Sequence, residues 1–272
     1  MAVYGYLFSF MLKNSYFYNE IKNRLIKKKI FSDLNYIEHY KKDATDFDYF
    51  EERKGATAHD ERRVREYIIS KVGRNVNSIL DAGCGRAWVA KHYLPKGVNV
   101  HSLDISATNP AKAIKFYPSK NHFAIAADSF HLPFAERSFD CVIASEIIEH
   151  IVDPAKFINE LFRVVNKGGQ LIITTPYKEK ITYYLCIHCN EKTPANAHLH
   201  SFDEKKLEDL YSGDDLEEFN YNTFGNKLLI ILRTYSILQF FPFWLWRVKD
   251  KFANVFFKKP VHIICTYKKK SS

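Results

Sequence analysis

The stretch Ser78-Ile-Leu-Asp-Ala-Gly-Cys-Gly-Arg-Ala-Trp-Val-Ala90 decides which fold this chain is expected to adopt. Its apolar start is typical of a short buried strand that ends at Asp81, and a helix is expected from Arg86. Between them, Gly83 and Gly85 predict a tight turn that a nucleotide-like ligand can approach closely, because no Cβ intervenes. Such a turn alone is a weak indication, since many strand-to-helix turns carry glycine. The order of the surrounding motifs therefore decides the matter.

Outward from this stretch, strand-like and helix-like segments alternate along the chain. Helices are expected at 59–72, from Arg86 to before Pro95, and at 146–151, 154–165 and 203–212. Strands are expected at 77–81, 98–104, 123–128, 139–145, 171–176, 216–224 and 261–267. This alternation predicts an α/β fold, with a Rossmann-like, seven-stranded, mostly parallel sheet and helices on both of its faces.

Around that core the sequence suggests four parts. Residues 1–57 are expected to be an N-terminal helical or cap extension, and 58–225 the core, with a lid or metal loop at 177–201. Residues 226–260 form an aromatic, basic insertion before the last strand, and 261–272 hold that strand and a basic tail.

Length and cysteine use narrow the class of protein. A chain of 272 residues is long enough for one α/β domain with additions. Five cysteines, only two of them close in sequence, favour a reducing compartment over a disulfide framework. Charged residues interrupt the first apolar stretch, so no signal peptide is expected. We therefore expect a cytoplasmic protein.

The net charge of +9 is unevenly distributed. Residues 1–30 carry +5 and residues 226–272 carry +9, whereas the centre, 31–225, carries −5. Both basic ends are also rich in aromatic residues. The sequence thus predicts a mildly acidic domain with basic, aromatic ends.

Acidic residues follow the second and third expected strands. Asp104 lies about 20 residues beyond the glycine turn, where a carboxylate can accept hydrogen bonds from both hydroxyls of a ribose. The alternative for Asp104 is a helix cap or a turn. A nicotinamide dinucleotide site is disfavoured, because the position of the third glycine in its fingerprint is Trp88.

Four motifs together resemble a known family. LDAGCG, LDIS, AADSFHLPFAERSFDCVIASEIIEHI and LFRVVNKGGQLIITTP resemble, in this order and spacing, class I S-adenosylmethionine-dependent methyltransferases. The branch they are most similar to includes the quinone-biosynthesis methyltransferases, and the resemblance covers roughly 60–177. It implies that the chain is an enzyme with S-adenosylmethionine as its cofactor.

The resemblance also implies a role for each cofactor-site residue. The glycine loop would meet the methionine part of the cofactor, Asp104 the ribose, and Asp128 the adenine amino group, while Ser145 would face the sulfonium. The complete expected cofactor set is Asp81, Gly83, Gly85, Asp104, Ile105, Asp128, Ser129 and Ser145. The third loop glycine of the family is Ala87 here, which costs little if that position is helical.

Glu146-x-x-Glu149-His150 is the first of two further constellations. On a helix, this spacing brings the three side chains within reach of one face. Neutral imidazole titrates near working pH, so His150, with Glu149, is a candidate to deprotonate an acceptor hydroxyl. The alternative is that the Glu-His pair simply fixes the helix.

The second constellation is Cys186-Ile-His-Cys189 followed by His198-Leu-His200. Cys186, Cys189, His198 and His200 are the right residue types for a tetrahedral zinc ion, although H-x-H is not the usual zinc-finger spacing. A lid without metal is the alternative. A third interpretation joins both constellations, since E-x-x-E-H with a downstream H-x-H-x-F resembles the divalent-metal site of small-RNA 2′-O-methyltransferases.

The insertion at 226–260 contains two apolar runs split by Arg233 and Pro242, which is too interrupted for a spanning helix. Its tryptophans and lysines suit an amphipathic element at an anionic membrane surface. A substrate lid and a dimer contact are the alternatives. Bases with aromatics would also suit nucleic acid, but no known nucleic-acid-binding module is matched.

These expectations combine into one function. The chain is expected to transfer a methyl group from S-adenosylmethionine to a small-molecule acceptor that is hydrophobic or lipid-linked. One alternative is a metal-dependent 2′-O-methyltransferase acting on a ribose or RNA end. The other is a methyltransferase-like protein that binds a partner without turnover.

Overall fold

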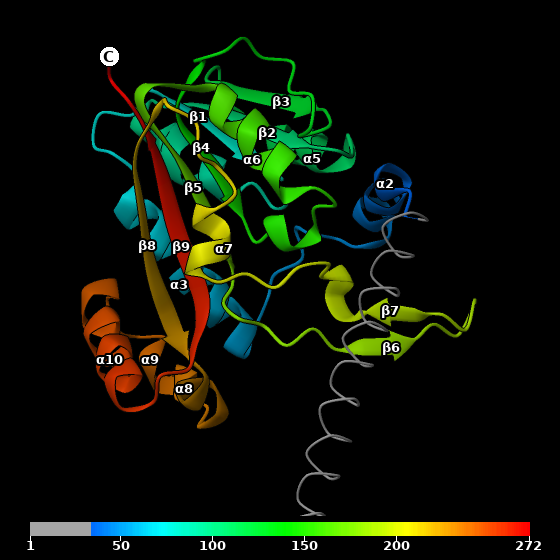
Figure 1. Ribbon diagram of the computed structural model, residues 1–272, viewed down its shortest axis with the longest axis vertical. Coiled ribbons are helices and arrows are strands. Elements are labelled where there is room, and N and C mark those ends of the chain that lie inside the picture. Colours follow the sequence, from blue (N-terminus) through cyan, green and yellow to red (C-terminus); the bar gives the residue numbers. More distant parts are fainter. Residues whose placement is uncertain (1–33) are drawn as a thin grey trace, which may run out of the picture.

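The computed structural model describes residues 34–272, which form a seven-stranded sheet with helices on both faces and a separate two-stranded hairpin (Figure 1). The strand order is β3-β2-β1-β4-β5-β9-β8, with β1 to β5 parallel and β9 antiparallel to both neighbours. The strands of the sheet are β1 Ser78–Ala82, β2 Asn99–Asp104, β3 His122–Ala126, β4 Phe139–Ser145, β5 Val165–Pro176, β8 Leu216–Asn226 and β9 Pro260–Lys269. The hairpin consists of β6 Tyr183–Leu185 and β7 Lys192–Pro194. The predicted fold class is confirmed.

Helices fill the connections as the alternation of segments predicts. They are α2 Tyr36–Asp46, α3 Gly55–Lys71, α4 Trp88–Tyr93, α5 Thr108–Phe116, α6 Pro154–Arg163, α7 Glu204–Glu208, α8 Lys227–Ile231, α9 Tyr235–Leu238 and α10 Phe243–Phe256. Local chemistry explains the start of α6, where the Asp153 side chain accepts from the Lys156 amide and Pro154 occupies the first turn. Part of the extension expected over 1–57 falls on residues 1–33, which lie outside the described residues.

Helices bury the central strands of the sheet on both faces. Successive residues of these strands point to opposite sides and so pack against different helices. Ile79 packs with α3 and α4, whereas the next residue, Leu80, packs with α6. Both side chains are fully buried. Two apolar layers therefore hold the carboxyl ends of the parallel strands rigidly, and those ends carry the candidate site.

The prediction of a helix at 146–151 is wrong. Glu146 has a left-handed φ of 54°, and only a 3₁₀ turn, Ile148–His150, follows it. The Glu146 amide still donates to the Thr174 carbonyl at 2.9 Å, so the chain remains tied to β5 and cannot yet turn into a helix. Glu146, Glu149 and His150 therefore do not share one helical face.

Ala87 also differs from the expectation of a helical position. Its φ is 53°, and α4 begins only at Trp88, although a helix was expected from Arg86. The Ala87 amide closes a turn by donating to the Cys84 carbonyl at 2.7 Å. Alanine in this conformation costs about 1–2 kcal/mol relative to right-handed backbone, a cost that glycine would avoid.

The insertion is folded onto the core by a buried arginine of α3. Arg63 is 1% exposed and donates to the carbonyls of Leu238 and Phe241 at 2.5 and 3.0 Å. Its guanidinium also lies 5.0 Å from the ring centre of Trp246 in α10. Helices α8 to α10 thus form an ordered body at one end of the molecule (Figure 1). Among the residues described, no helix is both long and apolar enough to cross a membrane.

Arg63→Ala should lower the free energy of unfolding by about 2–4 kcal/mol, because the charge-assisted hydrogen bonds of a buried guanidinium to the Leu238 and Phe241 carbonyls are lost. Urea unfolding measures the change. The matched control is Arg74→Ala, in which an exposed arginine just after α3 is removed and at most about 1 kcal/mol should be lost. Equal losses in the two variants would contradict the anchoring role.

Candidate cofactor and active site

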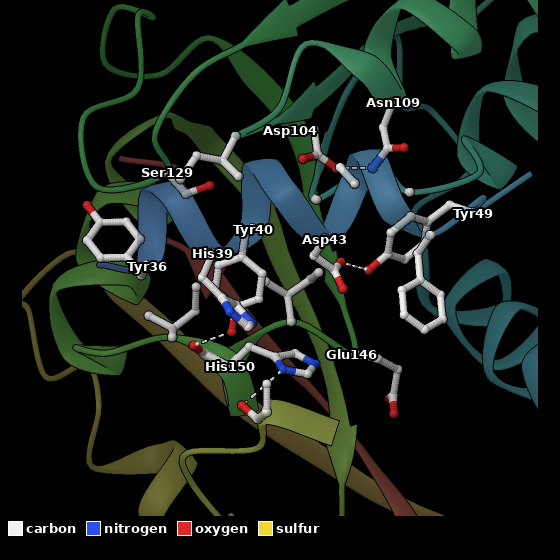
Figure 2. A pocket seen from close by; sticks show the side chains of 18 of the residues that line it. Tyr36, His39, Tyr40, Asp43, Tyr49, Asp104, Asn109, Ser129, Glu146 and His150 are labelled. Atoms are coloured by element: carbon white, nitrogen blue, oxygen red, sulfur yellow. Dashed lines mark hydrogen bonds between the residues drawn. The ribbon is translucent and has the colours of Figure 1, made fainter. Parts of the chain in front are cut away.

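A cavity of about 530 Å³ opens where the carboxyl ends of β1, β2 and β4 face α2 (Figure 2). That volume lies within the range typical of small-molecule sites. Six of the eight expected cofactor residues line it: Gly83, Gly85, Asp104, Ile105, Asp128 and Ser129. The tertiary structure thus brings residues from three separate loops to one space.

The glycine loop is shaped for close approach to its backbone. Gly83 has a φ of 74°, and a Cβ there would lie 2.5 Å from Cδ1 of Ile147. The left-handed conformation favours glycine, and a Cβ would in addition force the Ile147 side chain to shift. The amides of Gly83 and Cys84 donate to the Leu103 carbonyl at 2.8 and 2.9 Å, which fixes the loop against the end of β2. This cradle fits a nucleotide-like cofactor.

Asp104 is oriented by its own loop. Its carboxylate accepts from the Ser106 amide at 3.1 Å and from Nδ2 of Asn109 at 3.0 Å. Burial raises the pKa of Asp104, while the hydrogen bonds to Asn109 and the neighbouring backbone oppose that rise. A carboxylate has about four acceptor positions, so lone pairs are left for two ribose hydroxyls.

Asp128 is already engaged by α2. Its carboxylate accepts from the Tyr36 hydroxyl at 2.6 Å and from the Phe130 amide at 2.9 Å. Burial and the neighbouring Asp128 raise the pKa of Tyr36 to about 12, so the phenol remains a donor. The expected contact of Asp128 with an adenine amino group would therefore be shared with Tyr36.

Asp81 and Ser145 do not line the cavity. Asp81 is 2% exposed, and burial raises its pKa to about 8, with the nearby Asp104 charge adding to the rise. The Ser145 hydroxyl lies 3.0 Å from that of Thr174. The proposed sulfonium contact of Ser145 stays a prediction.

Helix α2 supplies a wall of the cavity that sequence reasoning missed. Tyr36, His39, Tyr40 and Asp43 line the space from this helix (Figure 2). The Tyr40 hydroxyl donates to the His150 carbonyl at 3.2 Å, which joins the helix to the opposite side of the site. The spacing of three and four residues between these polar side chains was the signal that could have identified a functional face.

His150 lies across the cavity from Asp104 (Figure 2). Its Nδ1 is 3.3 Å from the Ala197 carbonyl, which can only accept, so Nδ1 carries the proton and Nε2 keeps a lone pair. Burial, with a smaller contribution from His198, lowers the pKa of His150 to about 4. The imidazole is therefore neutral at physiological pH and can accept a proton or bind a metal.

Glu149 is buried behind His150 and does not line the cavity. Its carboxyl accepts from the Thr175 hydroxyl at 2.9 Å, and burial, with the nearby Glu146, raises its pKa well above the usual range. The Glu149 carbonyl accepts the amides of Leu199 and His200 at 2.7 and 3.1 Å. Glu149 thereby fixes the 198–200 segment next to His150, and the cavity-facing base candidate is His150 alone.

Glu146 lines the cavity but is turned toward β9. Its carboxylate lies 3.3 Å from Nδ1 of His262, whose Nε2 lies 2.9 Å from the Asp60 carboxylate. Although burial opposes protonation, these two carboxylates raise the pKa of His262 well above its usual value. A protonated His262 therefore holds Glu146 in place.

The four residues expected to bind zinc are not brought together. Within residues 34–272, the group of side chains close enough to share a metal ion is Glu149, His150 and His198, whose ligand atoms lie within 4.8 Å of one another. Cys186 and Cys189 lie instead in the turn between β6 and β7, and Cys189 is exposed. The zinc prediction fails because the Glu149 backbone, and not the cysteine pair, positions the histidines.

The Glu149, His150 and His198 cluster has the features of a ligand set. Nδ1 of His198 lies 2.5 Å from the Glu179 carboxylate, just as Nδ1 of His150 faces the Ala197 carbonyl. Both imidazoles therefore present Nε2, with the other nitrogen held by an oxygen, as is usual for metal-ligating histidines.

Proton NMR of the histidine rings should show His150 titrating at about pH 4, well below the unperturbed value of about 6.5. Because its pKa is lower in the folded state, its contribution to stability is present above about pH 6.5 and is lost as the pH falls through 4. A His150→Gln variant assigns the signal. A midpoint near 6.5 would contradict the buried, neutral ring.

Comparison with known proteins identifies the core. Residues 80–173 match a family model described as "Methyltransferase domain". Residues 80–173 are a methyltransferase domain. The resemblance to the S-adenosylmethionine-dependent family predicted from the sequence is thereby confirmed.

Relatives match the methyltransferase domain over part of their length. The ubiquinone biosynthesis O-methyltransferase of Rickettsia prowazekii is 32% identical over 147 residues, which covers 50% of this chain and 58% of that protein. The malonyl-[acyl-carrier protein] O-methyltransferase of Erwinia billingiae is 31% identical over 102 residues, covering 38% and 40% respectively. The chain thus spans about half the length of the curated relatives it matches.

A solved structure agrees with the methyltransferase fold. Phosphoethanolamine N-methyltransferase 2 of Haemonchus contortus, in complex with S-adenosyl-L-methionine, matches with a TM-score of 0.54 at 16% identity. The match covers 77% of this chain and 52% of that protein. At this identity the likeness shows the fold alone.

Proposed function

We propose that this chain transfers the methyl group of S-adenosylmethionine to a small-molecule acceptor that is hydrophobic or lipid-linked. The observation that carries the proposal is the gathering of Gly83, Gly85, Asp104 and Asp128 around one cavity. The glycine cradle and the carboxylates suit the polar parts of the cofactor.

The rest of the cavity wall favours an apolar acceptor. Aromatic and aliphatic side chains line it beyond the carboxylates, among them Tyr40, Phe47, Ile147, Ile151 and Val152. Two of the relatives carry names that point the same way, the ubiquinone biosynthesis enzyme and the tocopherol O-methyltransferase of Arabidopsis thaliana. Such a wall would exclude water from the acceptor.

Catalysis in this proposal depends mainly on placement. Bound S-adenosylmethionine supplies an electrophilic methyl group on its sulfonium. Asp104 and the glycine loop hold one side of the cavity, and α2 covers the other and orders an acceptor against it. For a hydroxyl acceptor, Nε2 of neutral His150 takes the proton, because its Nδ1 is engaged by the Ala197 carbonyl.

Native mass spectrometry of the purified chain, followed by a labelled-methyl assay on an organic lipid and quinone extract, tests the proposal. Bound cofactor with label in an apolar product would support it, and His150→Gln should then slow an oxygen-directed transfer by about 10²- to 10⁴-fold. Bound cofactor without any labelled product would favour the non-catalytic binding protein. Absence of cofactor binding would overturn both.

A metal-dependent 2′-O-methyltransferase acting on a ribose or RNA end is the second candidate. The cluster of Glu149, His150 and His198 favours it, because a divalent ion held there would lie beside the cavity that His150 lines. Such an ion would bind vicinal hydroxyls of an acceptor and lower their pKa. Methyl transfer to RNA ends that requires added divalent metal would select this candidate over the first.

For its place in the cell, we propose a cytoplasmic protein that makes peripheral contact with membranes. An acceptor with a lipid tail would be found there, and the basic, aromatic insertion suits an anionic surface.

A further inference from the structure

The insertion exposes far more apolar surface than a domain in water normally leaves uncovered. Eleven large hydrophobic side chains between residues 230 and 257 are exposed. They are Ile230, Ile231, Leu232, Ile237, Phe240, Trp244, Val248, Phe252, Val255, Phe256 and Phe257. Exposed apolar side chains in this number within one segment indicate an interaction site.

Helix α10 shows that this exposure is arranged on one face. Trp246 and Asp250 point into the protein and are 4% and 1% exposed. The opposite side carries a stripe of five residues that are 57–68% exposed: Trp244, Val248, Phe252, Val255 and Phe256. Their spacing of three, four or one residues is that of a single helical face. One side of α10 is thus packed on the core, and the other has no partner among the described residues.

The charges around the stripe indicate what would cover it. Seven lysines and arginines lie between residues 227 and 259, and all seven are exposed. The only carboxylate in that range, Asp250, is buried and accepts from the Gly225 amide at 3.1 Å. At 100° per residue, Lys249 and Lys251 fall just outside the two edges of the apolar stripe. The exposed surface is therefore apolar in the middle and uniformly positive at its edges.

An apolar stripe with positive edges distinguishes between two possible binding partners, a second copy of the chain and an anionic bilayer. A second copy of the chain would bring the positive edges of one face against the positive edges of the other, which like-charge repulsion disfavours. The headgroup region of an anionic bilayer offers the complementary charge together with an apolar layer for tryptophan and phenylalanine. Complementary charge therefore favours lipid.

We propose that the exposed face of α8 to α10 docks on the surface of an anionic lipid bilayer, with the α10 stripe at the boundary between headgroups and acyl chains. The proposal rests on the peripheral membrane location proposed above and names the face responsible. Arg63 fixes this face to α3, so docking orients the whole domain. In Figure 1 the three helices lie at the opposite side of the molecule from the β6–β7 hairpin.

Co-sedimentation of the full chain with vesicles tests the docking face. Vesicles that contain phosphatidylglycerol in phosphatidylcholine should retain the protein at low salt and release it as salt rises, whereas pure phosphatidylcholine should retain little. The double variant Trp244→Ala/Phe252→Ala should weaken partitioning by about tenfold or more. Lys249→Glu/Lys251→Glu should weaken it by a similar or larger factor.

Matched controls separate the face from general hydrophobicity and charge. Ile187→Ala removes a fully exposed hydrophobic side chain from the hairpin turn, and Lys115→Glu/Lys120→Glu makes the same change in net charge on exposed lysines elsewhere. Both should leave partitioning nearly unchanged. Melting curves and S-adenosylmethionine calorimetry should be unaltered in every variant, which keeps a failure of docking distinct from a failure of the methyl-transfer proposal.

Three results would overturn the proposal. Lack of sedimentation with phosphatidylglycerol vesicles at low salt would refute both the docking face and the peripheral membrane location. If the α10 variants leave sedimentation unchanged, or if the controls reduce it equally, the α8 to α10 face is not the docking surface. Light scattering that shows a dimer dissociated by Trp244→Ala/Phe252→Ala would replace the bilayer with a second copy of the chain.

Discussion

Asp104→Ala should weaken binding of S-adenosylmethionine by about 10²- to 10⁴-fold while leaving the fold intact. Hydrogen bonds from hydroxyls to a carboxylate contribute about 1.5–3 kcal/mol each, and two of them correspond to this loss. Asp104 lies at the end of β2 and lines the cavity, so its removal opens no gap within the two apolar layers. Isothermal titration calorimetry gives the affinity directly.

Two further variants test whether the loss of affinity comes from the Asp104 carboxylate itself. Asp104→Asn keeps the shape and one acceptor but removes the charge, so its loss of affinity should be intermediate. Asp48→Ala removes a 58% exposed aspartate that pairs with Lys112 and does not line the cavity, so affinity should be unchanged. Unchanged affinity in Asp104→Ala would remove the ribose role, and with it the main support for cofactor binding at this site.

His198→Ala should abolish or severely weaken binding of one divalent metal ion, which Mn²⁺ titration followed by electron paramagnetic resonance would detect. The three ligand atoms of Glu149, His150 and His198 lie within 4.8 Å of one another, so losing one breaks the set. Loss of a residue that merely supports a ligand typically costs 10- to 100-fold in metal affinity, and we expect loss of a ligand to cost at least about that much.

Cys189→Ser is the informative control for the metal. The cysteine pair lies in the exposed turn of the hairpin and outside the cluster, so this variant should bind the ion as well as the parent chain. His188→Ala, a histidine substitution in the same turn, should also leave binding intact. Metal lost from Cys189→Ser, or no metal bound by the parent chain, would rule out the cluster as the site.

The metal cluster and the cofactor cavity meet at His150. Its ring belongs to the cluster and also lines the cavity. One histidine is therefore available either as a free base or as a metal ligand, and these roles exclude each other at Nε2. Metal dependence of methyl transfer is consequently the measurement that separates the two candidate functions.

The amino-acid sequence by itself determined the sheet and most of the candidate cofactor site. Strand patterns, glycines and strand-end carboxylates are local signals, and a parallel α/β sheet places every strand's carboxyl end at one edge. Knowing that Asp104 follows one strand and Asp128 the next was enough to place both at that edge. Gly83 was likewise identified, because a glycine turn directly after a buried strand is a local pattern.

The tertiary structure alone decided the rest of the site. Helix α2 became a cavity wall through contacts such as Tyr36 with Asp128 and Tyr40 with His150, which are 92 and 110 residues apart. His198 joined His150 because the Glu149 carbonyl binds the Leu199 and His200 amides, whereas spacing in the sequence favoured the two cysteines. Helical spacing can mark a polar face on α2, but no local period states which distant groups that face will meet once the sheet has formed.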